Sequence, residues 1–404
     1  MFTLFILVIF RAMAVIPIPG VDALRLGQFL SGNDFLGLLN IFSGGGLSKL
    51  SIIMLGVGPY ITASIIMQLM TIVFPKMKEL YQEEGEAGRR KFAQYSRLLT
   101  VPLAIVQAFS FMAILKSQGI LGALSPFNMA INIIVVTASS ILLMWLGELV
   151  TEFGVGNGLS LIIFSGIVAA LPSALGQLYF LIQSDPSQIP IYLAFVVASL
   201  LVIWGVVIIT EAERPIPVTY AKRVRGNKMY GGVSTYLPLR VNQAGVIPII
   251  FAISLLLFPQ MIANFLVNVS NSIVHNIAQF VVTTLANQWF YAILYFLLVF
   301  MFTYFYTAIT FDPDSISKNL QRNGAFIPGI RPGVSTSEYL SKTTTRLTFL
   351  GALFLGIIAV LPLITRSLTG IQSVAIGGTA LLIVVSVVID LIKKIDAQIS
   401  AREY

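Results

Sequence analysis

The sequence predicts an all-α polytopic membrane protein with ten transmembrane helices. Hydrophobic residues make up 57% of the 404 residues and charged residues only 10%, whereas a soluble domain carries about 25% charged residues. The apolar residues occur in ten runs that are long enough, or nearly long enough, to cross a bilayer. Most lysines and arginines lie in only some of the links between these runs, which is the pattern of a protein that crosses the membrane repeatedly.

Each predicted span follows from the length of one apolar run. The ten spans cover residues 1–16, 60–74, 98–116, 127–149, 159–175, 190–209, 244–266, 289–310, 347–364 and 371–392. The first run starts at Met1 without the basic region or the small-residue cleavage site of a signal peptide. We therefore expect it to be a membrane span whose beginning is missing from this sequence.

The basic residues indicate which side of the membrane each link occupies. Twenty of the 25 lysines and arginines lie in the links between spans two and three, six and seven, and eight and nine, and in the C-terminal tail. The positive-inside rule places these four segments in the cytoplasm. Both termini are then expected in the cytoplasm, as an even number of spans requires.

Two of the cytoplasmic links, residues 211–243 and 311–346, are much longer than the usual 4–6 residues. Both mix basic residues with glycine, proline and β-forming residues. We interpret them as docking surfaces that contain hairpins. The alternative is a pair of solvated charged loops that face lipid headgroups.

The stretch from Ile41 to Pro75 contains an unusual break in its apolar pattern. Leu47–Leu55 lies between three consecutive glycines and a Gly-Pro pair, and as a helix it would rise only about 14 Å. It cannot cross a hydrocarbon core of about 30 Å. Irregular backbone at membrane depth is tolerated only beside protein or a water-filled cavity, so we predict a short re-entrant helix at a pore or binding site. A re-entrant loop without function and an ordinary extracellular loop are the alternatives.

The sequence argues against catalytic chemistry. It has no cysteine, and it shows no Ser/His/Asp arrangement, phosphate-binding loop or cluster of metal ligands. Residues 154–158 are glycine-rich but follow no predicted strand, so we expect Asn157 or Ser160 to lie near a helix N-terminus. Glu148 and Glu152 are expected at a solvated helix end, and Asp312–Asp314 in a turn. We expect no enzyme activity, metal or cofactor.

The spans also contain few ionisable residues. Secondary transporters usually keep charged side chains within the membrane for ion coupling. A passage closed by apolar side chains, which exclude ions by dewetting, fits this composition better. A multi-span secondary solute transporter is the alternative function.

Motifs along the whole chain resemble the SecY family, the channel subunits of the bacterial protein-conducting translocon. The matching segments are Pro17–Gly20, Ser43–Ser48, Gly58–Ile65, Glu84–Lys91, Gly154–Ser160, Tyr220–Arg223, Leu237–Pro248 and Gly324–Gly333. The sequence lacks the basic segment that usually precedes the first span in this family. The resemblance implies a clamshell of two inverted, pseudo-symmetric halves, residues 1–182 and 183–404, hinged between spans five and six.

The resemblance also implies the role of specific residues. A plug at about residues 40–56 would include Ser43, Gly44, Gly45, Gly46, Leu47, Ser48, Ile52 and Ile53. An apolar pore ring would consist of Val57, Ile61, Ile163, Ile167, Ile250 and Ile383. A lateral gate between spans two and three and spans seven and eight would contain Gln68, Gln107, Phe258 and Asn264.

The implied function is passage of unfolded secretory polypeptides across the bacterial inner membrane and lateral release of membrane segments into the lipid bilayer. The SecA ATPase and the ribosome would dock on Lys222, Arg223, Lys228 and Arg331. Basic loops suit ribosomal RNA because RNA is polyanionic. The small subunits SecE and SecG, signal sequences and nascent polypeptides are the other implied partners.

Overall fold

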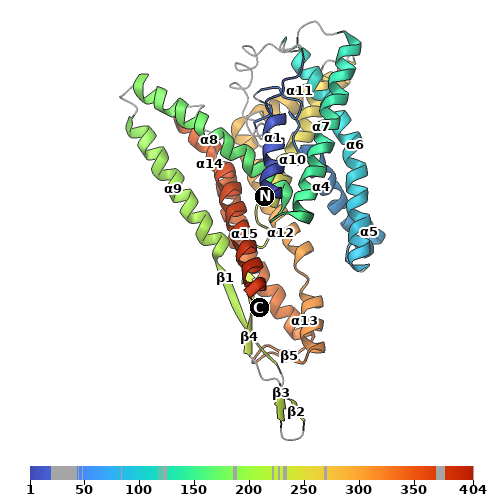
Figure 1. The fold of residues 1–404 in the computed structure, drawn as a ribbon, viewed down its shortest axis with the longest axis vertical. Coiled ribbons are helices and arrows are strands. Elements are labelled where there is room, and N and C mark those ends of the chain that lie inside the picture. The colour runs from blue at the N-terminus through green and yellow to red at the C-terminus, as the bar shows by residue number, and fades with distance from the viewer. Residues whose placement is uncertain are drawn as a thin grey trace.

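The computed structural model describes residues 1–19, 43, 45–47, 49–82, 84–117, 119, 121, 125–184, 189–220, 223–225, 228–230, 234–267, 271–369 and 378–403. Among these residues a helix occupies most of the described part of each predicted span (Figure 1). These helices are α1 (Phe2–Met13), α4 (Gly58–Val73), α6 (Gly85–Ser117), α7 (Pro126–Phe153), α8 (Gly158–Ser184), α9 (Ile189–Glu211), α10 (Ile247–Leu266), α12 (Gln288–Thr310), α14 (Val334–Thr369) and α15 (Gly378–Glu403).

Length and composition allow five helices in the described residues to cross a membrane by themselves. The number rises to six when α4 and α5 (Pro75–Gln82), which meet at a bend of 112°, are counted as one broken span. The helices α1, α8 and α10 provide shorter apolar stretches. The fold is therefore that of a multi-pass helical membrane protein, and the total of ten spans stays a prediction.

Two helices extend well beyond the apolar runs from which they were predicted. Helix α6 begins at Gly85 and α14 at Val334, so each continues past the expected membrane boundary. The prediction of a loop over residues 311–346 is therefore wrong for its last third, and Pro313–Arg322 near its start is helical as well. The cause is that the polar turns at the start of α14 form regular helix outside the bilayer, where an apolar-run criterion cannot detect them. The predicted hairpin is also wrong for this link, whose described strand is only Ala325–Phe326.

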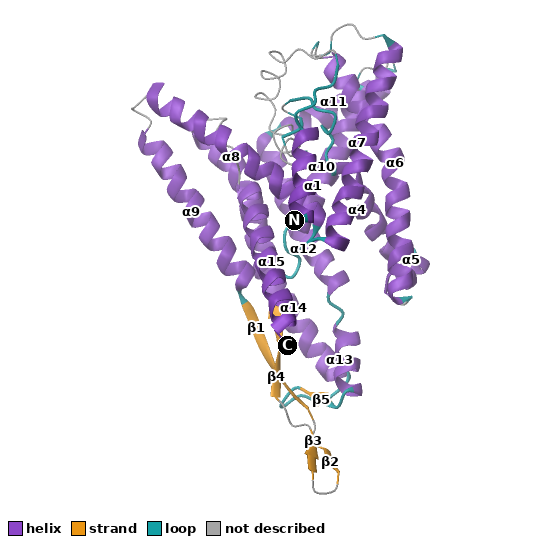
Figure 2. Ribbon diagram, viewed as in Figure 1, coloured by secondary structure: helices purple, strands orange, loops and turns teal. Residues whose placement is uncertain are grey.

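The long link between α9 and α10 forms the predicted hairpin. Strand β1 (Glu213–Tyr220) pairs with β4 (Ser234–Arg240) in antiparallel register from Glu213↔Arg240 to Thr219↔Ser234. A short strand, β5 (Ala325–Phe326), adds to the other edge of β1. The second hairpin, β2 (Arg223–Arg225) with β3 (Lys228–Tyr230), extends from the far end of the first (Figure 2).

The sheet is fixed to the helices by a small apolar cluster. Ile216 and Val218 alternate along β1 and are buried, as a half-buried strand requires. They pack with Leu239, Ile327 and Leu340, the last of which is on α14. The sheet therefore forms a rigid projection at one end of the helical bundle, with α13 (Pro313–Arg322) beside it (Figure 1).

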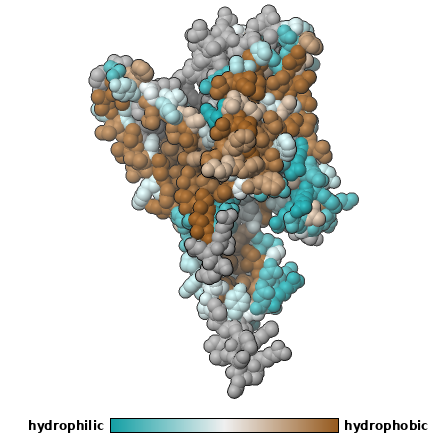
Figure 3. Space-filling model, viewed as in Figure 1, coloured by the Kyte–Doolittle hydropathy of each residue, from teal (hydrophilic) through white to brown (hydrophobic). Residues whose placement is uncertain are grey.

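The helical surface is strongly apolar. Figure 3 shows hydrophobic residues over the upper two thirds of the molecule and hydrophilic residues around the projecting end. Helix α9 is the extreme case, because Leu193, Leu200 and Trp204 are all more than 60% exposed. Exposed side chains of this kind are stable when they face lipid.

Candidate functional site

Six aliphatic side chains from four elements of the chain meet in one hydrophobic cluster. Val57 immediately precedes α4, and Ile163 and Ile167 lie four residues apart on α8. These three and Ile383 on α15 are buried, while the other two, Ile61 on α4 and Ile250 on α10, are partly buried against the same cluster. The six residues predicted to form the pore ring therefore belong to one cluster, which also contains many other side chains of the bundle, and their arrangement as a ring stays a prediction.

The chemistry of this set suits a seal. Five of the six are isoleucine and one is valine, and β-branched side chains have few accessible rotamers. They offer no hydrogen-bonding group to a chain that passes between them. A narrow ring of such side chains excludes water and ions by dewetting.

The segment before α4, which we call the plug segment (residues 40–56), does not form the predicted helix in its described part. Residues 43, 45–47 and 49–56 form turns, and Ser51 makes an isolated bridge to Pro17. Gly45, Leu50 and Gly56 have φ values of 81°, 40° and 55°. These left-handed conformations interrupt a right-handed helix. The apolar content of the segment therefore led to a wrong prediction of helix. Gly44, Ser48 and residues 40–42 lie outside the described residues.

The plug segment is nevertheless closely packed. Leu47, Leu50 and Met54 are completely buried in a second cluster with Ile18 and with side chains of α6 and α7. Ile53 belongs instead to the cluster of the pore-ring residues, and Ile52 is partly buried against both. The plug segment therefore lies directly beside the pore-ring residues.

Hydrogen bonds within the plug segment and to its neighbours hold it in place. The backbone N–H of Ile18 donates to the Leu50 carbonyl at 2.9 Å, and the N–H of Ile52 donates to the Ile16 carbonyl at 3.0 Å. Within the segment, Ser43 Oγ accepts from the Leu47 N–H at 3.1 Å. At its end the Ser140 hydroxyl on α7 donates to the Gly56 carbonyl at 2.8 Å. The sequence analysis did not identify Met54 or Ser140. No local sequence pattern indicates that Ser140 contacts Gly56, 84 positions away.

The predicted lateral gate is a closed seam, because α10 packs against both α4 and α6. Gln107 on α6 is buried, and Gln68 on α4 is partly buried with its Oε1 atom lacking a hydrogen-bond partner among the described residues. Phe258 and Asn264 belong to α10, but their side chains lie outside the described part of the structure. The assignment of these four residues to a gate stays a prediction.

The predicted docking residues lie at the projecting end of the molecule. Arg331 is exposed in a loop whose turns place Gly329 and Gly333 at positive φ. The Ser317 hydroxyl donates to the Gly333 carbonyl at 2.6 Å and that of Thr336 to the Arg331 carbonyl at 2.9 Å, so the loop is held at both ends. Arg223 is in β2 and Lys228 in β3, whereas Lys222 is outside the described residues.

Asp312 begins helix α13 instead of forming the predicted isolated turn. Its Oδ1 accepts from the backbone N–H groups of Asp314 and Ser315 at 3.0 and 3.3 Å. The Ser315 hydroxyl, at 2.6 Å from Oδ2, holds the pKa of the Asp312 carboxyl below its usual value. This residue therefore acts as a helix N-cap. In the described part of the chain, no group of three His, Cys, Asp or Glu residues is placed to hold a metal ion.

The remaining motifs have structural roles. Asn157 Oδ1 accepts from the N–H groups of Leu159 and Ser160 at 3.1 and 3.2 Å, which confirms that the glycine-rich segment caps α8. Glu148 pairs with Arg97 at 2.7 Å and joins α7 to α6, and its side chain is only 20% exposed. The prediction of a solvated helix end therefore holds for the exposed Glu152 and not for Glu148.

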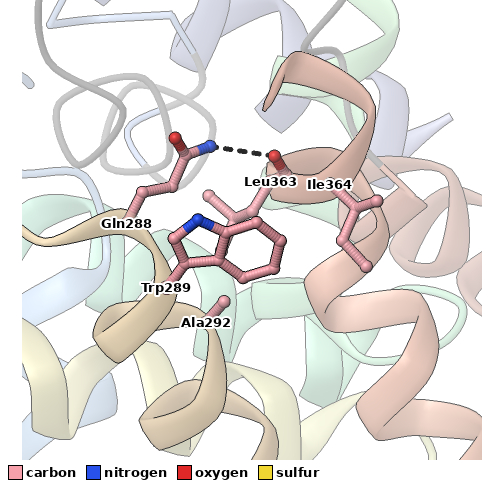
Figure 4. A pocket seen from close by; sticks show the side chains of 5 residues that line it. All are labelled: Gln288, Trp289, Ala292, Leu363 and Ile364. Atoms are coloured by element: carbon pink, nitrogen blue, oxygen red, sulfur yellow. Dashed lines mark hydrogen bonds between the residues drawn. The ribbon is translucent and has the colours of Figure 1, made fainter. Parts of the chain in front are cut away.

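The described surface includes two hollows of different character. One, of about 230 Å³, lies next to the sheet and between α8, α10 and α15; its polar lining includes Asn157, Arg240, Asn242, Ser386 and Asp390. The other is a shallow apolar depression between α12 and α14, where Gln288 Nε2 donates to the Leu363 carbonyl at 2.9 Å beside Trp289 (Figure 4). The first is the larger and more polar of these two hollows.

Comparison with known proteins identifies the family. A sequence model described as SecY matches residues 51–392. The protein translocase subunit SecY of Mycobacterium tuberculosis is 43% identical over 100% of this chain and 95% of its own length.

Solved structures show the same fold. A structure described as a protein-conducting channel superimposes with a TM-score of 0.68 at 22% identity, covering 98% of this chain and 91% of the other. A structure from a study of the plug domain of SecY gives 0.67 at 23% identity with the same coverage. The chain therefore belongs to the SecY family of protein translocase channel subunits.

Proposed function

We propose that the chain forms a passive, gated channel that passes unfolded secretory polypeptides across the bacterial inner membrane. The observation that carries this proposal is the convergence of Val57, Ile61, Ile163, Ile167, Ile250 and Ile383 on one cluster beside the buried plug segment. A polypeptide can pass such a ring without being held, because the ring offers it no hydrogen bonds. The alternative of a multi-span solute transporter is not favoured by the family to which the chain belongs.

The resting state in this proposal is closed at two levels. The pore-ring residues are proposed to close the waist, and the plug segment, whose Ile53 belongs to the same cluster, is proposed to block the space beside them. Opening requires the plug segment to leave its contacts with Ile18, α6 and α7. Separation of the pore-ring residues and displacement of the plug segment both expose apolar surface to water, unless a polypeptide covers that surface.

Lateral release would use the seam between α10 and helices α4 and α6. Polar contacts between membrane helices contribute only about 0.6–2 kcal/mol each. An apolar signal sequence could therefore replace the contacts made by Gln68, Gln107, Phe258 and Asn264 at little cost. Movement of residues 1–182 against residues 183–404 about the link between α8 and α9 would open this seam.

In this proposal the chain has no catalytic site of its own, so its partners supply the energy for transport. The projecting sheet, α13 and the loop around Arg331 form an exposed cytoplasmic surface suited to SecA and to the ribosome. SecE and SecG are the proposed membrane partners, and both termini are proposed to lie in the cytoplasm. The hollow lined by Asn242 and Ser386 lies at the same end of the bundle and would receive the polypeptide first.

The docking proposal is tested by Arg331→Glu. The side chain is exposed, so the variant should fold and insert normally while SecA-driven export is lost. Arg346→Glu is the matched control, because it makes the same charge reversal 12 residues into α14, about 18 Å along the helix from Val334. Normal export by Arg331→Glu, or equal loss in both variants, would contradict the assignment.

A further inference from the structure

Helix α11 (Ser272–Ala286) lies between α10 and α12 and is not explained by the channel function. Its 15 residues include no lysine, arginine, aspartate or glutamate. As a helix it is about 22 Å long, which is too short to cross a hydrocarbon core of about 30 Å. It lies at the end of the bundle opposite the sheet (Figure 1).

Three different surfaces run along α11. Ala278 marks the buried surface, which packs on α10 and α12. Ile273, Ile277 and Phe280 are 71%, 61% and 70% exposed, and their i, i+4, i+7 spacing places them in one stripe. A second exposed stripe, displaced by about 100° around the helix, contains Asn276, Gln279 and Thr283. The exposed half of α11 is thus divided into an apolar and a polar side.

The orientation of these stripes is fixed by contacts at both ends of α11. Asn271 caps the first turn by accepting from the Ile273 N–H at 3.0 Å. His275 Nδ1 lies 2.7 Å from the carbonyl oxygen of Val267, the residue that follows α10. At the other end a single residue, Asn287, separates α11 from α12 and caps the latter. The apolar stripe therefore cannot turn inward without breaking the junctions with both neighbouring helices.

The next helix, α12, carries an exposed apolar row of its own. Trp289, in the first turn of α12, is 68% exposed, and Ile293, Leu297 and Met301 continue as exposed apolar residues along the same helix. An exposed apolar row of this length on a spanning helix faces lipid, and tryptophan concentrates where the hydrocarbon meets the headgroups. Helix α11 ends at Ala286, only three residues before this tryptophan.

We propose that α11 is an interfacial helix whose stripe of Ile273, Ile277 and Phe280 inserts into the lipid of the outer leaflet, with Asn276, Gln279 and Thr283 facing water. The division of an exposed helix into an apolar and an uncharged polar side is what an interfacial position requires. The bilayer thereby anchors the outer end of α10, the helix that closes the seam with α4 and α6. Assignment to the outer leaflet rests on the proposed orientation of the channel, whereas contact with lipid does not.

The chain contains no cysteine, so single nitroxide labels can be attached to introduced cysteines without first replacing native ones. We would place one cysteine at each of positions 273, 277 and 280, and matched ones at 276, 279 and 283, in the full chain reconstituted in phospholipid vesicles. The collision rates of each label with oxygen, which concentrates in lipid, and with a water-soluble nickel chelate would then be measured. Three positions in each stripe keep the test decisive if one variant does not reconstitute.

The proposal predicts that the ratio of oxygen to nickel accessibility is high at 273, 277 and 280 and reversed at 276, 279 and 283. Nickel accessibility at all six positions would overturn it, because the apolar stripe would then face water. Shielding of the first three labels from both reagents would also overturn it, because a protein surface would then cover the stripe. Neither result depends on whether the chain transports polypeptides.

Discussion

Replacing Met54 by alanine should loosen the plug segment and make the resting channel leak ions. Met54 is completely buried among Ile18 and the side chains of α6 and α7, and truncation of such a methionine costs about 2–5 kcal/mol. If the substitution destabilises only the packed state, and by about 2 kcal/mol, the ratio of packed to displaced plug falls about 30-fold. Chloride efflux from proteoliposomes without translocation partners measures the displaced population directly.

Two controls separate a loose plug from a loose protein. Met144→Ala makes the same truncation at a buried residue of α7 that does not belong to the plug cluster, so it should not leak even if it lowers the thermal stability. Lys49→Ala removes an exposed side chain of the plug segment itself and should also stay closed. No increase in chloride efflux for Met54→Ala, or equal efflux for Met144→Ala, would refute the reasoning.

Three further predictions follow from individual contacts. Ser140→Ala removes the hydroxyl that donates to the last carbonyl of the plug segment, and an unsatisfied buried acceptor costs about 1–3 kcal/mol; a smaller leak than that of Met54→Ala should be measured. Gly158→Ala places a Cβ in steric overlap with the backbone oxygen of Gly147 on α7, so the yield of folded protein in detergent should drop sharply. Gly176→Ala, with nothing within 4 Å of the new Cβ, should leave the yield unchanged. The carboxyl of Asp312 has a lowered pKa, so its contribution to stability is present above its unfolded-state pKa and is lost as the pH falls through its folded-state pKa. Ser315→Ala should raise the pH at which this loss occurs, as measured by carbon-13 NMR titration of the carboxyl, and an unchanged titration would contradict the role of the hydroxyl.

The helices were predictable from the sequence because the bilayer imposes both a length and an apolar composition on them. Helix α7 illustrates the limit of this criterion. Its apolar run indicated residues 127–149, and the structure adds Pro126, with Ser125 as N-cap, at one end and the turn to Phe153 at the other. Helix caps and polar extensions are set by local hydrogen bonds, which an apolar-run criterion does not measure.

The plug segment was the main failure of prediction from the sequence. Its apolar residues suggested a short helix, but Leu50 adopts φ 40° and the chain turns repeatedly. The conformation is decided by tertiary contacts, such as the bond from Ser140 to Gly56 and the bridge between Ser51 and Pro17. Contacts between residues so distant in sequence have no local signature.

The convergence of the pore-ring residues was expected only from the family resemblance. Periodicity places Ile163 and Ile167 on one face of α8, but it does not indicate that this face meets Ile383 of α15. The structure shows α8 packed on α15 and all three residues in one buried cluster. The sequence of one helix does not indicate which helix it packs against. The site could therefore not be predicted from periodicity without knowledge of the fold.

Cross-linking to a polypeptide arrested during transport tests the central claim most directly. Single cysteines at positions 57, 61, 163, 167, 250 and 383 would be introduced into the cysteine-free chain, with a cysteine in place of Ile134, an exposed residue of α7, as the control. If these residues form the waist of the channel, a thiol-reactive probe on the arrested polypeptide should capture all six ring cysteines and not the control. Capture at Ile134 but not at the six positions would contradict the account.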